Sequence, residues 1–367
     1  MSIFGSTLDE LQQLCADEGL PRYVARQLCD WMYQKRATSF EQMTNLSLAV
    51  RARLAAMESI EPNYPIDCQV SRDGTKKYLF EEQVVAPDGT SSTQYVEAVY
   101  IPAGNATASP HHGISLHLAS TDHSTPDRAT LCVSCQAGCR MNCSFCVTGR
   151  GGYHGNLTTR QILNQIFAIP ESQQLTNIVY MGMGEPMDNY DNVLRSTRVL
   201  TEAWGLAWSP QRITVSSVGV IPRLRRFIEE SRCHVAVSLH DPLHAERLRL
   251  MPAEKAYPIA DVVAMLREYD WEGQRRISFE YTMFDGINDS IAHADQLLRL
   301  LHGLRCRINL IRFHASPLTP YRTSRPEAIR AFQDYLNAHG LTCTLRASRG
   351  EDIQAACGLL AGQAKKK

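Results

Sequence analysis

Five of the 12 cysteines in this 367-residue chain lie within residues 132–146. Three of them, Cys139, Cys143 and Cys146, form a C-x3-C-x2-C string. Zinc sites normally take four protein ligands, often as paired CxxC knuckles, and no CxxC pair occurs outside residues 132–146. Three thiolates instead suit a 4Fe-4S cluster that leaves one iron open to a substrate or cofactor. The string therefore predicts an iron–sulfur site with these three cysteines as ligands.

Two other residues have reactive side chains but also ordinary interpretations. Glu97 stands between Val96 and Ala98, and its position alone favours a carboxylate that faces solvent. Cys357 is a lone cysteine near the C-terminus, and such a residue is usually a small buried side chain. Neither position predicts catalysis by itself.

Strand ends carry a second group of candidate residues. Gly184 and Glu185 follow one expected strand, where glycine lets the backbone approach a ligand and the carboxylate can accept hydrogen bonds from an ammonium group. Ser216 and Ser238 stand at or near the ends of two others. Because βα proteins bind ligands at the carboxyl ends of their strands, we expect these residues at one edge of a sheet.

The elements that must position these residues alternate between strand and helix from residue 127 onward. Strand-like runs cover residues 130–133, 177–183, 212–218, 234–239, 277–283, 307–313 and 342–346. Between them, helical spacing recurs, as in the segment that a Ser324-Arg-Pro-Glu327 capping box opens and Gly340 ends. This pattern predicts an α/β fold with a parallel sheet, arranged as an open or closed (βα) barrel.

The chain before residue 127 predicts two smaller units. Residues 1–62 read as a small helical domain that begins with a capping box from Thr7 to Glu10. Residues 63–126 read as a β extension whose last part, residues 103–126, is an inserted loop. Residues 127–367 form the barrel core in this division.

Charge and hydropathy limit the classes of partner. Residues 1–126 contain 9 basic and 15 acidic side chains, whereas residues 127–367 contain 29 and 23, so an anionic partner is expected on the second part. No apolar run is long enough to span a bilayer, and residues 1–14 show no charged-then-apolar leader. We therefore expect a cytoplasmic protein without a membrane partner. We also expect a monomer.

The cysteine string resembles the signature of radical S-adenosylmethionine (SAM) enzymes. The longer string from Leu131 to Gly149 resembles, more narrowly, the RlmN family of RNA methyltransferases that act on adenine carbon 2. The similarity extends over nearly the whole chain, through Glu97-Ala-Val-Tyr-Ile-Pro102, Gly182-Met-Gly-Glu-Pro186, Thr214-Val-Ser-Ser-Val-Gly219, Ser238-Leu-His240 and Arg349-Gly-Glu-Asp-Ile-Gln-Ala-Ala-Cys-Gly358. It implies a partial (βα) barrel of the radical SAM type.

The resemblance also implies roles for single residues. Cys357 would carry a methyl group, Cys132 would be its resolving partner, and Glu97 would be a proton acceptor. The residues that would contact SAM are Gly184, Glu185, Ser216, Ser238, Leu239, His240 and His314. The implied mechanism uses two SAM molecules per turnover and an electron donor such as a flavodoxin-type reductase. It ends in a disulfide between Cys132 and Cys357 that must be reduced.

The implied substrates are an adenosine of 23S rRNA and the anticodon-adjacent adenosine of some tRNAs. Two alternatives remain open: the sister family that methylates carbon 8 and confers antibiotic resistance, and a non-catalytic RNA-binding protein with a structural metal. Five arginines are candidate contacts for RNA phosphates: Arg140, Arg150, Arg223, Arg225 and Arg226. For each of them, a position on a solvated, charged surface is an equally good explanation.

Two positions depart from the family pattern. Residue 135 is cysteine where many relatives have serine, and residue 314 is histidine where many have a cofactor-contacting asparagine. The imidazole of His314 can still donate or accept a hydrogen bond.

Overall fold

The computed structural model describes residues 2–103, 128–271, 273, 275–315 and 319–353. Ten strands form one sheet in the order β1-β2-β3-β4-β7-β8-β9-β10-β11-β12, and β5 and β6 form a separate pair. The strands are β1 (Asp67–Val70), β2 (Lys76–Val85), β3 (Ser91–Ile101), β4 (Thr130–Cys132), β5 (Gln136–Gly138), β6 (Tyr153–Asn156), β7 (Asn177–Tyr180), β8 (Ile213–Ser217), β9 (His234–Ser238), β10 (Ile277–Met283), β11 (Arg307–Arg312) and β12 (Cys343–Leu345).

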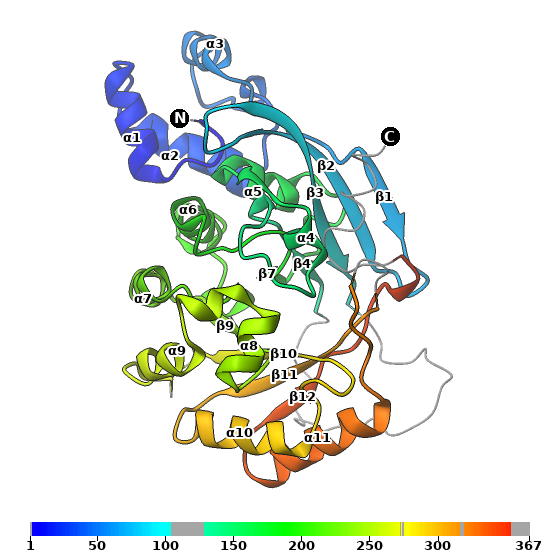
Figure 1. Ribbon diagram of the computed structural model, residues 1–367. Coiled ribbons are helices and arrows are strands. Elements are labelled where there is room, and N and C mark those ends of the chain that lie inside the picture. The colour runs from blue at the N-terminus through cyan, green and yellow to red at the C-terminus, as the bar shows by residue number, and fades with distance from the viewer. Residues whose placement is uncertain (1, 104–127, 272, 274, 316–318, 354–367) are drawn as a thin grey trace.

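Helices follow most of the parallel strands and stack along the outer side of the sheet (Figure 1). The α-helices are α1 (Leu8–Asp17), α2 (Tyr23–Cys29), α3 (Leu48–Met57), α4 (Val147–Arg150), α5 (Thr159–Phe167), α6 (Tyr190–Thr201), α7 (Ile221–Glu230), α8 (His244–Leu250), α9 (Ile259–Leu266), α10 (Ile291–Leu301) and α11 (Pro326–Ala338). Short helical turns cover η1 (Asp30–Gln34), η2 (Phe40–Gln42), η3 (Pro210–Arg212), η4 (Pro252–Lys255) and η5 (Glu351–Ile353).

The strands from β4 to β12 in the large sheet pair in parallel, in chain order. All seven predicted strands of this region are present, and the sheet has two free edges, β1 and β12, in the described residues. This confirms the α/β fold with an open, partial barrel. Every residue of β10 is buried, as expected for a parallel strand covered on both faces.

An antiparallel extension continues the same sheet at the β4 edge. β3 pairs with β4 and β2, and a turn at Gly89, whose φ is 84°, joins β2 to β3. The β extension expected within residues 63–126 is therefore present in the described residues. Most of the expected inserted loop, residues 104–127, lies outside the described residues.

The N-terminal helices pack beside α5 and β2 at one end of the sheet (Figure 1). The predicted capping box is formed: Glu10 donates its backbone N–H to Thr7 Oγ1, and the Thr7 N–H donates to the Glu10 carboxylate at 2.9 Å. Within this unit, the buried hydroxyl of Tyr33 donates to the Ser6 carbonyl oxygen at 2.6 Å. In the described residues, no helix combines the length and apolarity needed to cross a membrane.

Two local predictions differ from the structure. The cap of α11 is Arg325 rather than Ser324, because Pro326 occupies the first helical position and leaves Ser324 outside the turn. Ser324 Oγ is buried without a hydrogen-bond partner among the described residues. The β5–β6 pair was not predicted, because its two strands have only three and four residues and lack an apolar alternation.

Candidate active site

One cavity of about 250 Å³ opens at the carboxyl ends of the parallel strands. The cysteine string lines one side of the cavity. The other side is lined by the C-terminal parts of strands β7 to β11 and by residues that follow these strands. Of the residues expected at the site, the lining includes Cys139, Cys143, Cys146, Gly184, Glu185, Ser216, Ser238 and His240. The structure therefore brings these strand-end residues together around one cavity.

The β5–β6 pair anchors the cysteine string. The Cys139 N–H donates to the Gly152 carbonyl oxygen at 3.0 Å, and a side chain at Gly138 would place its Cβ 1.9 Å from that same oxygen. The Cys146 N–H donates to the Cys143 carbonyl oxygen at 3.0 Å, which closes a turn around the second and third thiols. These contacts turn all three cysteines toward the cavity.

The three thiols fit a metal cluster. None forms a disulfide, and burial raises the pKa of Cys139 to about 12 and that of Cys143 further. A thiolate ligand here therefore needs a bound cation to offset its desolvation. Cys139, Cys143 and Cys146 would hold a 4Fe-4S cluster, and the rest of the cavity is free for a second ligand.

Cys135 does not join this set. It is buried, its N–H donates to the Met183 carbonyl oxygen at 2.9 Å, and burial holds the pKa of its thiol well above the ordinary value. It does not line the cavity. The structure therefore gives Cys135 a packing role.

The glycines of the loop after β7 are required by the protein's own backbone rather than by a ligand alone. Gly184 has a φ of 101°, and a Cβ there would lie 2.5 Å from Gln136 Cβ. A Cβ at Gly182 would lie 2.6 Å from the Val133 carbonyl oxygen. The loop can pack against the 133–136 segment only because both residues lack a side chain.

Glu185 is fixed by the backbone around it. Its Oε1 accepts the Met187 N–H at 3.0 Å and its Oε2 accepts the Val218 N–H at 2.9 Å. Complete burial nevertheless raises its pKa to about 7. A cationic ligand in the cavity would favour the charged form of this carboxylate.

His240 adopts a left-handed backbone conformation, with a φ of 56°. Its Nδ1 lies 3.0 Å from the Thr282 N–H and accepts its hydrogen bond, and burial lowers its pKa to about 3. The ring is therefore neutral and carries its proton on Nε2. Leu239 is buried beside it and does not line the cavity, but its carbonyl oxygen accepts a hydrogen bond from Arg247 at 2.9 Å.

The structure does not bring His314 to the cavity. Its Nδ1 lies 3.9 Å from Glu351 Oε1, and its side chain is 39% exposed. Residues 316–318, which begin two positions after His314, lie outside the described residues.

The pairing register places the other expected residues on one face of the sheet. Cys132 pairs with Val99, which lies two positions after Glu97 and therefore on the same face of β3 as Glu97. The pairing register continues without a shift through β7, β8, β9 and β10. Because directly paired residues share a face, Glu97, Cys132, Ser216, Ser238 and Glu280 all lie on the face that lines the cavity.

Glu97 is buried, so the solvent-facing interpretation is wrong. Its Oε2 lies 3.2 Å from Lys77 Nζ, and both side chains are about 1% exposed. A buried carboxylate of this kind requires such a partner. Cys357 lies outside the described residues, and no described cysteine forms a disulfide.

Three side chains important to the site were missed by sequence reasoning. Glu280 and Arg346 line the cavity, and Arg247 supports it from behind. Glu280 Oε1 accepts from Ser278 and Asn309, whereas its buried Oε2 has no partner among the described residues and is open to a ligand. The sequence feature that could have identified Glu280 is the presence of an acidic residue inside the apolar run 277–283.

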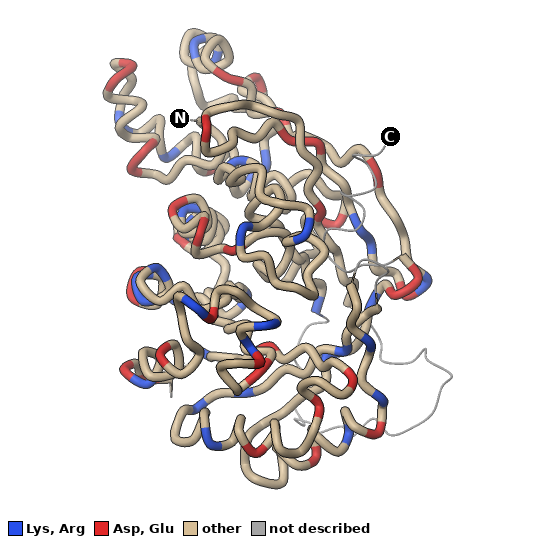
Figure 2. Tube along the Cα trace, viewed as in Figure 1, with Lys and Arg blue, Asp and Glu red and all other residues tan. Residues whose placement is uncertain are grey.

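Most candidate phosphate contacts are paired with acids. Arg140 and Arg223 lie 2.9 Å and 3.9 Å from Asp188 oxygens, and Arg226 lies 3.1 Å from Glu230. Arg225 pairs with Glu268, and the Arg150 Nε donates to the Ser144 carbonyl oxygen at 3.3 Å. Figure 2 shows basic and acidic segments interleaved along the outer helices. The solvated-face interpretation is the better one for these arginines.

Comparison with known families matches both parts of the chain. A model described as "Radical SAM superfamily" matches residues 133–299, and one described as "Ribosomal RNA large subunit methyltransferase N-terminal domain" matches residues 1–60. A radical SAM methyltransferase from Sphaerobacter thermophilus has a similar solved structure, with a TM-score of 0.82, 39% identity and 98% of each chain covered.

Two relatives extend the similarity to full length, and both are named as RlmN dual-specificity RNA methyltransferases. The protein from Porphyromonas gingivalis is 50% identical, over 98% of this chain and 96% of its own. The protein from Syntrophus aciditrophicus is 38% identical, over 99% and 97%. With the cysteine-lined cavity and both family matches, these similarities show that the chain belongs to the RlmN family of radical SAM RNA methyltransferases.

Proposed function

We propose that this enzyme methylates carbon 2 of a specific adenosine in 23S rRNA and of the anticodon-adjacent adenosine in some tRNAs. The supporting observation is the single sheet face that carries Glu97, Cys132, Ser216 and Ser238 and lines the cavity with the three cluster cysteines. Family membership makes the chain an enzyme, so the non-catalytic interpretation is set aside.

In this proposal, Cys139, Cys143 and Cys146 hold the 4Fe-4S cluster. Gly184, Glu185, Ser216 and the segment 238–240 surround SAM. The cluster and SAM together supply the radical chemistry that the electron-poor carbon 2 requires. Two SAM molecules are used per turnover, one of them as methyl donor to Cys357.

The chain's own thiols complete the reaction. The Cys357 thiolate accepts the methyl group, whose carbon later bonds to carbon 2 of adenine. The Cys132 thiolate then attacks the Cys357 sulfur; the carbon–sulfur bond breaks, its electron pair stays on the carbon, and that carbon takes a proton. The resulting disulfide needs two electrons from an external reductant before the next turnover.

Glu97 would accept the proton that leaves carbon 2. Its Oε2 lies 3.2 Å from Lys77 Nζ in a buried pair, on the same sheet face as Cys132. This location suits a base that acts inside a closed site.

Residues 1–62 serve as an RNA-binding domain, residues 63–126 as a β extension, and residues 127–367 as the catalytic core. We also propose a cytoplasmic monomer that receives electrons from a flavodoxin-type reductase. The target base must leave its stack to reach the cavity.

The decisive experiment incubates the anaerobically reconstituted, reduced enzyme with unmodified 23S rRNA and tRNA. Mass spectrometry of the digested RNA should find methyl groups at adenine carbon 2. Methylation at carbon 8 would instead assign the chain the chemistry of the sister family.

Cysteine variants test the mechanism. Cys357→Ala should abolish methylation, and Cys132→Ala should trap a covalent protein–RNA adduct, visible as a retarded band. Cys68→Ala is the matched control, because Cys68 is exposed on β1. Retained carbon-2 methylation by Cys357→Ala would refute the methyl-cysteine route.

A further inference from the structure

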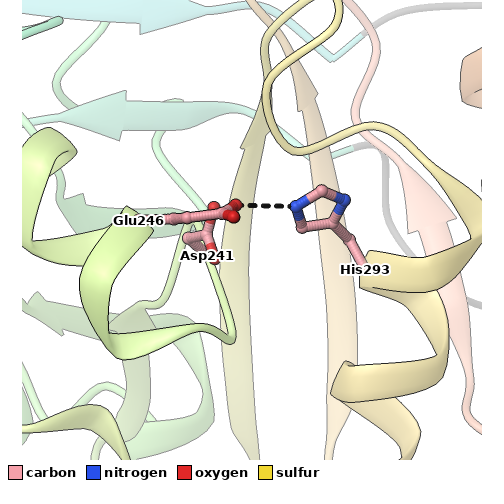
Figure 3. Close-up of side chains that lie close together, drawn as sticks. All are labelled: Asp241, Glu246 and His293. Carbon is pink, nitrogen blue, oxygen red and sulfur yellow. Dashed lines mark hydrogen bonds and ion pairs between the residues drawn. The ribbon is translucent and has the colours of Figure 1, made fainter.

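Three side chains of metal-ligand type lie close together at the loop that follows β9 (Figure 3). Asp241 belongs to that loop, Glu246 to α8 and His293 to α10. One ligand atom from each lies within 4.8 Å of the others. None of the three lines the cavity of the candidate active site.

Asp241 has an unused oxygen that points to a missing ligand. The residue is fully buried, and its Oδ1 accepts the Leu243 N–H at 2.8 Å. Its Oδ2 is also buried and has no hydrogen-bond partner among the described residues. Leaving a buried carboxylate oxygen without a partner is unfavourable, so this atom favours a cation beside it.

The neighbouring charges do not remove this need. Burial raises the pKa of Asp241 to about 6, with a smaller contribution in the same direction from nearby Glu246. Arg247 is close, but its guanidinium is used by Glu254 and by the carbonyl oxygens of residues 218, 238 and 239. His293 faces Glu246 rather than filling the open position at Asp241.

The geometry of His293 and Glu246 suits joint ligation. His293 Nε2 lies 2.9 Å from Glu246 Oε2. Adjacent ligand atoms of a tetrahedral zinc site, each about 2.0–2.1 Å from the ion, stand about 3.3 Å apart, which is close to this separation. His293 Nδ1 lies 2.7 Å from Ser290 Oγ, which can accept its proton and leave Nε2 free to ligate, as in many metal sites.

We propose that Asp241, Glu246 and His293 bind a divalent first-row transition metal ion. One imidazole and two carboxylates suit zinc or manganese better than magnesium or calcium, which prefer oxygen ligands alone. Water completes the coordination on the side where Glu246 is 37% exposed. The ion joins the β9–α8 loop to α10 and is separate from the cluster cysteines.

The test uses the full-length holoenzyme after removal of loosely bound metal. Equilibrium dialysis against Zn²⁺, followed by elemental analysis, should find about one zinc per chain in addition to the cluster iron. Zinc X-ray absorption should show only nitrogen and oxygen ligands at about 2.0–2.2 Å. Sulfur ligation at about 2.3 Å would place the zinc on cysteines and overturn the proposal.

Two variants and two controls localise the binding. Asp241→Asn and His293→Gln should each weaken zinc binding by more than about tenfold, since even the loss of an outer-shell partner weakens metal binding by about 10–100-fold. Asp261→Asn and His302→Gln change exposed residues on α9 and after α10, and should bind zinc like the wild type.

Thermal melting keeps the proposal testable where a variant is unstable. Zn²⁺ should raise the melting temperature of the wild type and both controls, but not that of Asp241→Asn or His293→Gln. No zinc uptake by the wild type, or equal uptake by all five proteins, would show that the three side chains form only a hydrogen-bonded cluster. The outcome is independent of RNA methylation.

Discussion

At the residue scale, one buried guanidinium holds the ends of β8 and β9 together. Arg247 is fully buried and donates to the carbonyl oxygens of Val218, Ser238 and Leu239 at 2.8–3.0 Å, while Glu254 supplies the opposite charge. These carbonyls belong to the segments that contribute Ser216, Ser238 and His240 to the cavity. Arg247 is thus a positioning residue for the site.

Arg247→Met should therefore destabilise the protein strongly. The variant leaves Glu254 buried without its cation, a change that usually lowers the free energy of unfolding by about 3–5 kcal/mol. Urea denaturation would measure it, with Arg249→Met as the control because Arg249 is exposed on the same helix. A loss for Arg247→Met no greater than that for the control would contradict the positioning role.

Glu185 should make stability depend on pH. Its folded pKa of about 7 lies above the ordinary value of 4.5, so the folded state binds the proton more tightly than the unfolded state does. The resulting stabilisation is complete below about pH 4.5 and is lost as the pH rises through 7, by a total on the order of 3 kcal/mol.

The measurement compares the wild type with Glu185→Gln between pH 5 and pH 8. The free energy of unfolding of the wild type should fall relative to that of the variant over this range. Parallel pH profiles for the two proteins would show that Glu185 does not titrate there.

At the element scale, the loop after β7 depends on a residue without a side chain. Gly184→Ala would force a Cβ to within 2.5 Å of Gln136 at a φ of 101°, and should lower stability by more than about 1 kcal/mol. Because Glu185 would move with the loop, SAM binding should weaken as well. Calorimetric melting and SAM dialysis would check both effects.

Gly273→Ala is the matched control for this prediction. A Cβ at Gly273 meets no atom within 4 Å, and its backbone is not left-handed. Gly184→Ala behaving like this control in both measurements would mean that the loop adjusts without strain.

At the scale of the whole molecule, Arg160 of α5 ties the N-terminal helices to the barrel. Its guanidinium donates to Glu58 at 2.8 Å and to the carbonyl oxygens of Ser59 and Glu61 at 2.7 and 3.1 Å. Its side chain is 27% exposed, so part of this attachment is shielded from water.

Arg160→Ala should loosen the N-terminal unit more than the barrel. Losing charge-assisted hydrogen bonds at this junction should reduce stability by about 1–2 kcal/mol and speed proteolysis near residue 60. Limited proteolysis with mass spectrometry would locate the first cut. Arg22→Ala, which removes only an exposed contact to Gln12, should leave the cleavage pattern unchanged.

Much of the fold could be predicted from local sequence patterns. The seven core strands and the Thr7–Glu10 capping box depend on hydrophobic periodicity and backbone preferences within a few residues. The Ser324 cap failed because Pro326 competes for the same helix start. The β5–β6 pair has too little pattern of its own to be recognised.

The sequence by itself determined the cysteine string, the strand-end positions and the family, because these are encoded in residue type and short spacing. Only the tertiary structure decided which distant residues meet. It buried Glu97 against Lys77, placed Cys132 on the face that lines the cavity, and kept His314 out of that cavity. It also revealed Glu280, Arg247 and the Asp241 cluster. Burial and pairing register arise from contacts between segments far apart in the chain, and local patterns do not specify such contacts.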